Sequence, residues 1–325
     1  MKKKILIIIT FLAGTLMFNS CLKDKLNSDW TSSLAGKMYA EIPNNGKQSN
    51  TITPDPTDQD IKFLVNIATD ALPTSDITMT LAIDPAALSA YNAANLAAYL
   101  VANNNDSTGF IRFKIYPTMT IVNPSVVIKA GTRNNYVHVT LKSANLLNLS
   151  TSWMVPISIT AVTGGVTITA NKKTVLIATP IANKWEGKYK MVTGSTFSDL
   201  SFPAYTINFP ANFALETAGP YTVNVKDLSA GLPTQYAREF NAAGTGSYYG
   251  TWCPVFQIDP VTNKVTSVVN YYINPANGRT GLIDPAGVNT YNPVTKTFDV
   301  SYFVLQPVPA IRLKFHDILT WSSPL

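Results

Sequence analysis

The sequence predicts an all-β protein with a single helical insertion. From Asp60 onward, apolar and polar residues alternate in short runs that are rich in Thr, Val and Ile and are separated by turn residues, which is the pattern of half-buried strands. One long segment breaks this alternation with helical spacing. With 46% hydrophobic and 14% charged residues, the chain is too apolar for disorder, and 325 residues are too many for one average domain. We therefore expect two β domains.

The N-terminus has the features of an export signal. Three lysines precede an apolar run from Ile5 to Phe18, which is shorter than the roughly 20 residues that cross a bilayer as a helix. Ser20 and Cys21 follow, and they resemble the bacterial lipobox, in which the cysteine becomes the acylated first residue of the mature protein. Phe18 and Asn19 depart from the usual lipobox residues. We expect a signal peptide at 1–20 and lipidation of Cys21, with a plain signal peptide as the alternative.

The segment 21–34 is polar with mixed charge, which predicts a tether. Cleavage before Cys21 removes three lysines and no acid, so the formal net charge falls from +6 to +3. The remaining cations are scattered singly, and nucleic acid is not an expected partner. Acylation of Cys21 would leave Cys253 without a disulfide partner, and we expect Cys253 to be a small buried hydrophobic residue.

The N-terminal domain is expected to span residues 35–182 as a β-sandwich. Its predicted helix begins with Asp84 as the N-cap and Pro85 at the first helical position, and Ala, Leu and Tyr continue at helical spacing to residue 104. Turn residues predict end connections at 129–135 and 162–168. Alternation predicts strands in four runs: 61–68, 77–83, 137–141 and 155–160.

Four short motifs of this domain, taken in order, resemble a known family: Tyr91-Asn92, Ile115–Pro117, Val127–Thr132 and Trp153–Ile159. They are similar to the N-terminal domain of unknown function (DUF1735 type) of Bacteroidetes surface lipoproteins. The resemblance covers roughly residues 35–180. It implies an immunoglobulin-like sandwich followed by a second domain, in an outer-membrane lipoprotein that faces the cell exterior and is associated with polysaccharide uptake. It implies no catalytic residue.

The C-terminal domain is expected to span residues 183–325. Trp185, Gly187 and Tyr189 open it as a W-x-G-x-Y pattern, which is similar to the lipocalin-like barrels that follow this family. We expect an antiparallel β-barrel or strongly curved sheet, because closure removes exposed edges, with a second sandwich as the alternative. Turn residues occur at Asn277-Gly278 and within 291–298. Alternation predicts strands at 205–209, 221–225, 255–260, 265–273 and 297–304.

Catalytic and metal sites are not expected. Asp55, Asp58 and Asp60 have the spacing of the D-x-x-D-x-D-x-E motif of chitinase-like glycosidases, but Lys62 replaces the final acid. Solvated linker acids ahead of the first strand are the preferred interpretation, and a calcium site is the alternative. The two histidines, His138 and His316, have no spaced cluster of ligands around them, so we expect no metal, no cofactor and no enzymatic activity.

The sequence offers one candidate ligand site, a glycine-rich loop between residues 244 and 253. Flat aromatic faces in such a loop are suited to stacking on sugar rings, and polar side chains nearby would bond the hydroxyls. The alternative is that Trp252 and Tyr249 are core residues. The predicted ligand-binding residues are Trp252, Tyr248, Tyr249, Arg238 and Gln257.

These observations favour a cell-surface lipoprotein that binds a polysaccharide or oligosaccharide without catalysis. It would be held on the outer membrane by a lipid anchor and would act with other surface glycan-uptake proteins. The alternative is a structural or adhesive lipoprotein with no small ligand. Aromatic rings open to solvent distinguish the two, since a sugar platform needs them.

Overall fold

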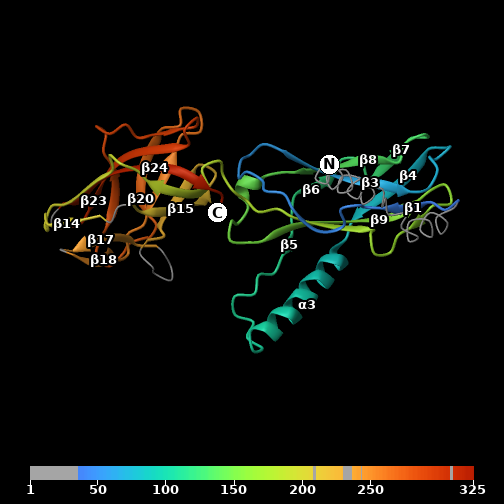
Figure 1. Cartoon of the computed structure of the whole chain (residues 1–325), viewed down its shortest axis with the longest axis horizontal. Helices are drawn as coiled ribbons and strands as arrows, with labels where there is room; N and C mark the ends of the chain where they lie inside the picture. Colours follow the sequence, from blue (N-terminus) through green and yellow to red (C-terminus); the bar gives the residue numbers. More distant parts are fainter. Residues whose placement is uncertain (1–35, 208–209, 230–235, 243, 308–309) are drawn as a thin grey trace, which may run out of the picture.

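The computed structural model describes residues 36–207, 210–229, 236–242, 244–307 and 310–325. Cys21 and the predicted signal peptide and tether therefore lie outside the described residues. Figure 1 shows two β lobes that follow one another along the long axis, with one helix projecting from the N-terminal lobe. Within the described ranges, no helix is long and apolar enough to cross a membrane.

The N-terminal lobe consists of two sheets. Strand order is β10-β1-β3-β8-β6 in the first and β2-β11-β9-β4-β7 in the second, where β5 also pairs with β9. Three of the pairings are parallel, namely β1 with β10, β2 with β11 and β5 with β9. The strands are β1 (Tyr39–Glu41), β2 (Gly46–Ser49), β3 (Gln59–Ala68), β4 (Ile77–Ile83), β5 (Lys114–Ile115), β6 (Met119–Ile121), β7 (Ser125–Ile128), β8 (Asn134–Leu141), β9 (Trp153–Val162), β10 (Thr167–Ile168) and β11 (Thr174–Ala178).

A sandwich core lies between these sheets. In β3 the buried side chains alternate with accessible ones, as a strand with one buried face requires. The core is formed by aliphatic residues of both sheets, among them Val65, Ile67, Val139, Ile157 and Val175. A short 3₁₀ helix, η1 (Ala144–Leu146), follows β8.

The N-terminal end of helix α3 (Pro85–Ala102) packs on the outer face of the second sheet, and the rest of the helix projects away from it. Asp84 is its N-cap and accepts a hydrogen bond from the Ala87 N–H at 2.9 Å. Leu88 packs on Met154 of β9 and Leu176 of β11. Six consecutive residues of β9 are consequently buried, because one face of the strand meets the sandwich core and the other meets α3. The helix predicted from the Asp84-Pro85 pair is confirmed.

The C-terminal lobe is dominated by a ten-stranded antiparallel sheet. Its main order is β20-β19-β16-β15-β12-β24-β23-β21, with β13 and β22 on β24 and β23, and a separate small sheet has the order β14-β17-β18. The strands are β12 (Gly187–Met191), β13 (Thr196–Asp199), β14 (Tyr205–Thr206), β15 (Asn212–Gly219), β16 (Thr222–Asp227), β17 (Arg238–Ala242), β18 (Thr245–Tyr249), β19 (Pro254–Ile258), β20 (Val265–Asn270), β21 (Thr280–Ile283), β22 (Thr290–Asn292), β23 (Thr297–Leu305) and β24 (Ile311–Ser323).

The large sheet curls into a nearly closed barrel. Its end strands β20 and β21 approach so closely that a Cβ on Gly281 would lie 2.5 Å from the Val268 carbonyl oxygen, which only glycine avoids. Gly187 on β12 also leaves no room for a larger side chain, since a Cβ there would lie 2.5 Å from the Trp321 indole nitrogen. The nearly closed sheet agrees with the prediction of a barrel or strongly curved sheet. It does not agree with the alternative, a second β-sandwich.

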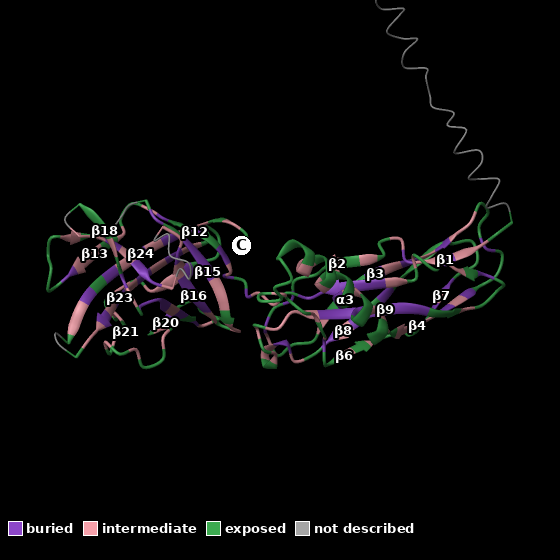
Figure 2. Cartoon of the chain, turned by 90° about the horizontal axis from the view of Figure 1, so that it is seen from below, coloured by how far each residue is buried: buried purple, intermediate pink, exposed green. Residues whose placement is uncertain are grey.

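Large side chains fill the barrel interior, as the buried stretches of its strands in Figure 2 indicate. Four alternate residues of β23 are buried and point inward: Phe298, Val300, Tyr302 and Val304. Trp185 and Tyr189 of the W-x-G-x-Y pattern are also core residues, and the Tyr189 hydroxyl donates to the Trp185 carbonyl at 2.9 Å.

The strand predictions hold for the central strands and fail at the periphery. The predicted run 77–83 coincides with β4, and 297–304 lies within β23. Two short strands, β1 and β2, precede the predicted first strand, and Asp60 lies inside β3 rather than in a linker. Residues 271–273 lie beyond the end of β20, where the sequence predicts continued strand.

Candidate functional site

The loop predicted to be a sugar platform does not present its main aromatic ring to solvent. Trp252 is 0% exposed, and its ring packs against Tyr302 with centroids 6.2 Å apart. Tyr249 is 3% exposed and donates its hydroxyl to Asp199 at 2.7 Å. The expectation that Trp252 forms a solvent-exposed platform is wrong, because the Trp252 and Tyr249 rings are part of the barrel core. The core alternative holds for both residues.

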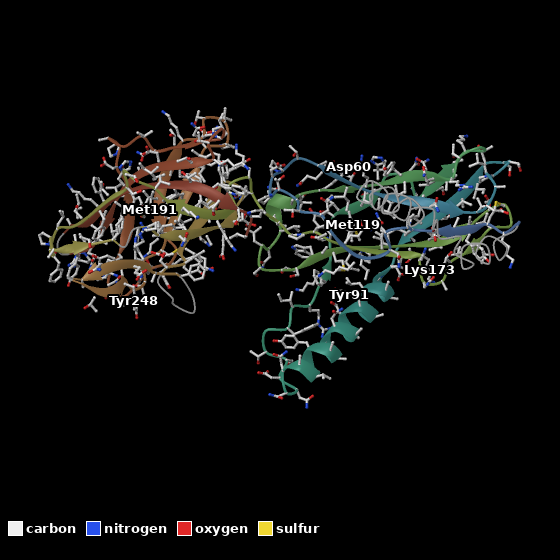
Figure 3. All side chains as sticks on the ribbon, in the orientation of Figure 1. Asp60, Tyr91, Met119, Lys173, Met191 and Tyr248 are labelled. Atoms are coloured by element: carbon white, nitrogen blue, oxygen red, sulfur yellow. The ribbon has the colours of Figure 1, made fainter. Side chains whose placement is uncertain are left out.

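The other residues of the predicted site do not form one surface either. Arg238 is 1% exposed, donates to Asp317 at 2.7 Å and lies over the Phe213 ring at 4.4 Å. It is therefore part of the core and cannot reach a ligand outside the barrel. Tyr248 and Gln257 are exposed, but they lie on different sheets, Tyr248 on β18 and Gln257 on β19. Figure 3 shows Tyr248 at the surface of the C-terminal lobe.

The acidic and histidine residues form pairs rather than clusters. Asp60 contacts His138 at 2.8 Å, and Asp58 lies 3.6 Å from Lys142. Asp55 instead accepts bonds from Thr53 and from the hydroxyl and backbone N–H of Thr57, which lower its pKa with the Thr57 hydroxyl as the largest cause. Among the described residues, no group of three or more possible metal ligands occurs.

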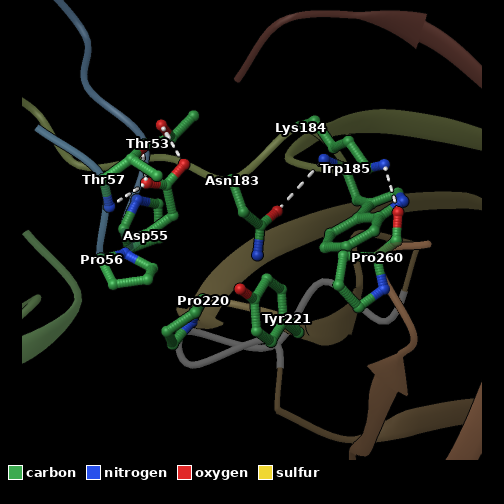
Figure 4. A pocket seen from close by; sticks show the side chains of 11 residues that line it. Thr53, Asp55, Pro56, Thr57, Asn183, Lys184, Trp185, Pro220, Tyr221 and Pro260 are labelled. Carbon is green, nitrogen blue, oxygen red and sulfur yellow. Dashed lines mark hydrogen bonds between the residues drawn. The ribbon is translucent and has the colours of Figure 1, made fainter. Parts of the chain in front are cut away.

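A hollow of about 330 Å³ lies at the junction of the two lobes (Figure 4). Its polar groups are already bonded within the protein. Asn183 donates to the carbonyls of Gly219 and Thr222 and accepts from the Trp185 N–H, while the Lys184 ammonium lies 3.1 Å from the Asn263 amide oxygen. These bonds fasten the connecting segment to the C-terminal lobe and leave few groups to recognise a ligand.

The better candidate is a groove of about 490 Å³ beside α3. In Figure 1 the helix runs away from the sheets, and the connection from its C-terminus returns beside it to β5. Helix and returning chain are fastened by Asn92, which is 7% exposed. Its Nδ2 donates to the Phe113 carbonyl at 2.9 Å, and its Oδ1 accepts from the Phe113 N–H at 3.1 Å. We call this hollow the α3 groove.

A second fastening lies at the far end of the helix. The Tyr99 hydroxyl donates to the Thr108 carbonyl at 2.6 Å, and Phe110 packs on the Tyr99 ring with centroids 5.5 Å apart. Gly109 between them has a φ of +84°, and a Cβ there would lie 3.2 Å from the Tyr99 hydroxyl. Glycine therefore permits both the turn and the close approach to Tyr99.

The groove is lined by aromatic rings and uncharged polar groups. The rings of Tyr91, Tyr99, Phe110 and Phe113 are each partly accessible, and Figure 3 shows Tyr91 on α3 close to the sheets. Asn95 is exposed and uses Nδ2 to bond the Tyr91 carbonyl at 2.7 Å, so its amide oxygen remains an acceptor. The Lys47 ammonium lies over the Phe113 ring, 5.3 Å from its centroid.

The groove continues into a neighbouring hollow of about 350 Å³ along the edge of the second sheet. Lys47, Phe113 and Ser152 line both hollows, and Trp153, Pro180 and Ile181 line the second one. Among the described residues that line the two hollows, none carries a carboxylate, an imidazole or a thiol. The arrangement can stack and hydrogen-bond a ligand, but it offers no pair of acids for glycoside hydrolysis.

Comparisons with known proteins gave one matching family model and several similar solved structures. A family model described as a "-like, N-terminal domain" matches residues 35–166. No protein with a curated description matches the chain. A Bacteroides ovatus protein of unknown function is similar in structure, with a TM-score of 0.54 and 11% identity over 88% of this chain and 95% of that one.

Two further solved structures are more distant. One is a multidomain Bacteroides ovatus protein that includes DUF1735, with a TM-score of 0.44 and 10% identity over 87% of this chain and 93% of that chain. The other is an auxiliary nutrient binding protein from Bacteroides thetaiotaomicron, with a TM-score of 0.41 and 14% identity over 85% and 90%. The first similarity supports the overall fold, and at these identities none of them assigns a ligand.

Sequence reasoning missed the α3 groove. Tyr91 and Tyr99 follow helical spacing, which is equally typical of residues that pack a helix on a core. Phe110 and Phe113 lie beyond the helix, in a stretch that has no clear strand pattern. The available signal was the helix itself, which has 18 residues and no charged side chain, an unusual composition for a helix that projects into solvent.

Proposed function

We propose that this protein binds an oligosaccharide non-catalytically, and that the α3 groove is the binding site. The observation that carries the proposal is a concave surface lined by four partly accessible aromatic rings. Aromatic faces meet the C–H groups of sugar rings, and nearby amides such as Asn95 bond hydroxyls, so the ligand gains contact without leaving its polar groups unpaired.

The size and shape of the groove fit a chain better than a single sugar. The two hollows of about 490 and 350 Å³ share Lys47, Phe113 and Ser152, so a linear ligand can occupy both at once. Bonds from Asn92 and Tyr99, at two points along α3, fix the groove before a ligand arrives. Such preorganisation lowers the entropic cost of binding.

The role we propose for the whole protein is glycan capture at the cell surface. The acylated Cys21 would hold it on the outer membrane, facing the exterior, where it would deliver glycan to uptake proteins. Cys21→Ala should abolish labelling of the protein by radioactive palmitate. Labelling of the mutant at the level of the unmodified protein would show that Cys21 is not the anchor.

A glycan array probed with the protein lacking residues 1–21, which retains every described residue, tests the binding proposal. We expect retention of at least one polysaccharide, and we expect Tyr91→Ala to weaken it about tenfold, equivalent to about 1.4 kcal/mol. Tyr248→Ala is the matched control, because Tyr248 is an exposed tyrosine of the other lobe, 52% accessible. Equal losses in both variants, or retention unaffected by Tyr91→Ala, would contradict the site.

A structural or adhesive role without a small ligand is the second candidate function. It is favoured by the exposed face of α3, where alanines and Val101, which is 85% exposed, carry no charge. An array on which the protein retains no glycan would leave this role as the better one.

A further inference from the structure

We propose that the α3 groove selects saccharides that carry an anionic group, a carboxylate or a sulfate, over neutral ones. This inference rests on the proposed function and narrows its ligand class. It starts from Lys47 of β2, the cation that lines both hollows of the groove. A ligand chain that occupied both hollows would pass over Lys47. The Lys47 ammonium group would then contact an anionic substituent near the middle of that chain.

Lys47 has no carboxylate partner among the ion pairs of the described residues. Its ammonium group lies over the Phe113 ring instead. A cation over an aromatic face at an exposed site is held only weakly. The ammonium group can therefore turn to a ligand anion without breaking an ion pair.

The charged side chains in the segment beside the groove are mostly cationic. The segment 85–115, which forms the wall of the groove, contains Arg112 and Lys114 and a single acid, Asp106. Asp106 lies beyond the end of α3 and accepts the Thr108 N–H. Residues lining the second hollow, other than Lys47, are uncharged. Because Lys47 is the one charged residue among the described residues that line the two hollows, the lining favours anionic ligands and disfavours cationic ones.

The helix composition supports the same conclusion. No residue of α3 between Pro85 and Ala102 is charged, so the helix neither neutralises Lys47 nor repels an anion. Binding of an anionic chain then combines ring stacking with one charge contact. Neutral chains can make the ring stacking but not the charge contact. The charge contact therefore gives the preference for anionic chains.

The test compares saccharides that differ only in charge. Dextran, carboxymethyl-dextran and dextran sulfate form one set, and polygalacturonate and its methyl ester form another. The protein lacking residues 1–21 should retain at least one anionic member better than its neutral counterpart. Lys47→Met, which keeps an apolar stem over Phe113, should weaken that anionic binding between about twofold and fivefold, while Lys47→Arg should retain it.

Lys62→Met is the matched control, because Lys62 also lies over an aromatic ring, that of Tyr136 at 5.2 Å, but on β3 of the other sheet. We expect no change with this variant. Raising the salt concentration should reduce the anionic preference.

Equal binding of every charged and neutral pair would overturn the anionic selectivity while leaving the glycan site intact. Equal losses in Lys47→Met and Lys62→Met would show non-specific attraction to the whole surface and would also overturn it. Failure to retain any saccharide, neutral or anionic, would instead reject the proposed function.

Discussion

Asn92 determines whether the α3 groove keeps its shape. Its side chain makes two hydrogen bonds to the backbone of Phe113, at 2.9 and 3.1 Å, and it is 7% exposed. Asn92→Ala removes both bonds and leaves the Phe113 N–H and carbonyl without these partners. At about 0.5–1.5 kcal/mol for each bond, the expected loss of unfolding free energy is about 1–3 kcal/mol.

The loss should be visible by calorimetry. For a folding unit of about 150–250 residues, 1 kcal/mol lowers Tm by about 2–4 °C, so Asn92→Ala should lower the transition of the N-terminal lobe by roughly 2–12 °C. Glycan affinity should fall in the same variant, because Phe113 would no longer be held beside α3.

Asn95→Ala provides the control on the same helix. Asn95 is exposed and bonds only the Tyr91 carbonyl within α3, at 2.7 Å, and alanine has the higher helix propensity. We expect its Tm to stay within about 2 °C of the unmodified protein, since exposed substitutions of this kind change stability by less than about 0.5 kcal/mol. If the two variants melt at the same temperature, the Asn92 bonds do not fasten the helix and the reasoning is refuted.

Three further changes test other parts of the fold. Asp84→Ala should cost about 0.5–2 kcal/mol by removing the N-cap of α3, whereas Asp84→Asn should cost less, and thermal melts that rank them in the opposite order would be inconsistent with capping. Trp252→Ala should cost about 3–5 kcal/mol in chemical denaturation, since the ring is fully buried, and a loss below about 1 kcal/mol would place it outside the core. Burial acts to raise the pKa of Asp199, but bonds from Arg312 and Tyr249 outweigh it and lower the pKa below 3.8. The stability this gives is present above the unfolded pKa and is lost as pH falls through the lower folded pKa, so Asp199→Asn should flatten the acid side of the stability profile. An unchanged acid slope would argue against that role.

The sequence predicts well the elements whose signals are local. Asp84 and Pro85 mark the start of α3 because a carboxylate caps free N–H groups and proline needs no bond at the first helical position. The β4 and β23 strands have one buried face, so alternation identifies them. The hairpin within 291–298 is also confirmed, with Asn292 opposite Thr297 across the turn.

Local sequence patterns do not predict elements that form only beside distant partners. The short strands β1 and β2 form because β10 and β11 lie beside them as parallel partners more than 100 residues later. Burial on both faces of β9 likewise depends on α3. We retain the division at residues 182 and 183 as a prediction of independent folding; the two large cores are formed by residues 40–177 and 185–319.

The binding site was the hardest part to predict. An aromatic residue near glycines is equally compatible with an exposed platform and with a core strand, and local sequence does not tell which face of the chain is covered. Trp252 is covered by Tyr302 from a strand 50 residues away. The α3 groove, conversely, requires the chain after residue 102 to return along the helix, which the long-range bonds of Asn92 and Tyr99 help to establish.

Hydrogen–deuterium exchange with and without the polysaccharide best retained on the array tests the central claim most directly. Binding in the α3 groove predicts slower exchange in residues 91–99 and 110–115, with no change in residues 244–257 or at the lobe junction around 183–185. Protection confined to 244–257 or to the lobe junction, with exchange along α3 unaltered, would contradict the assignment.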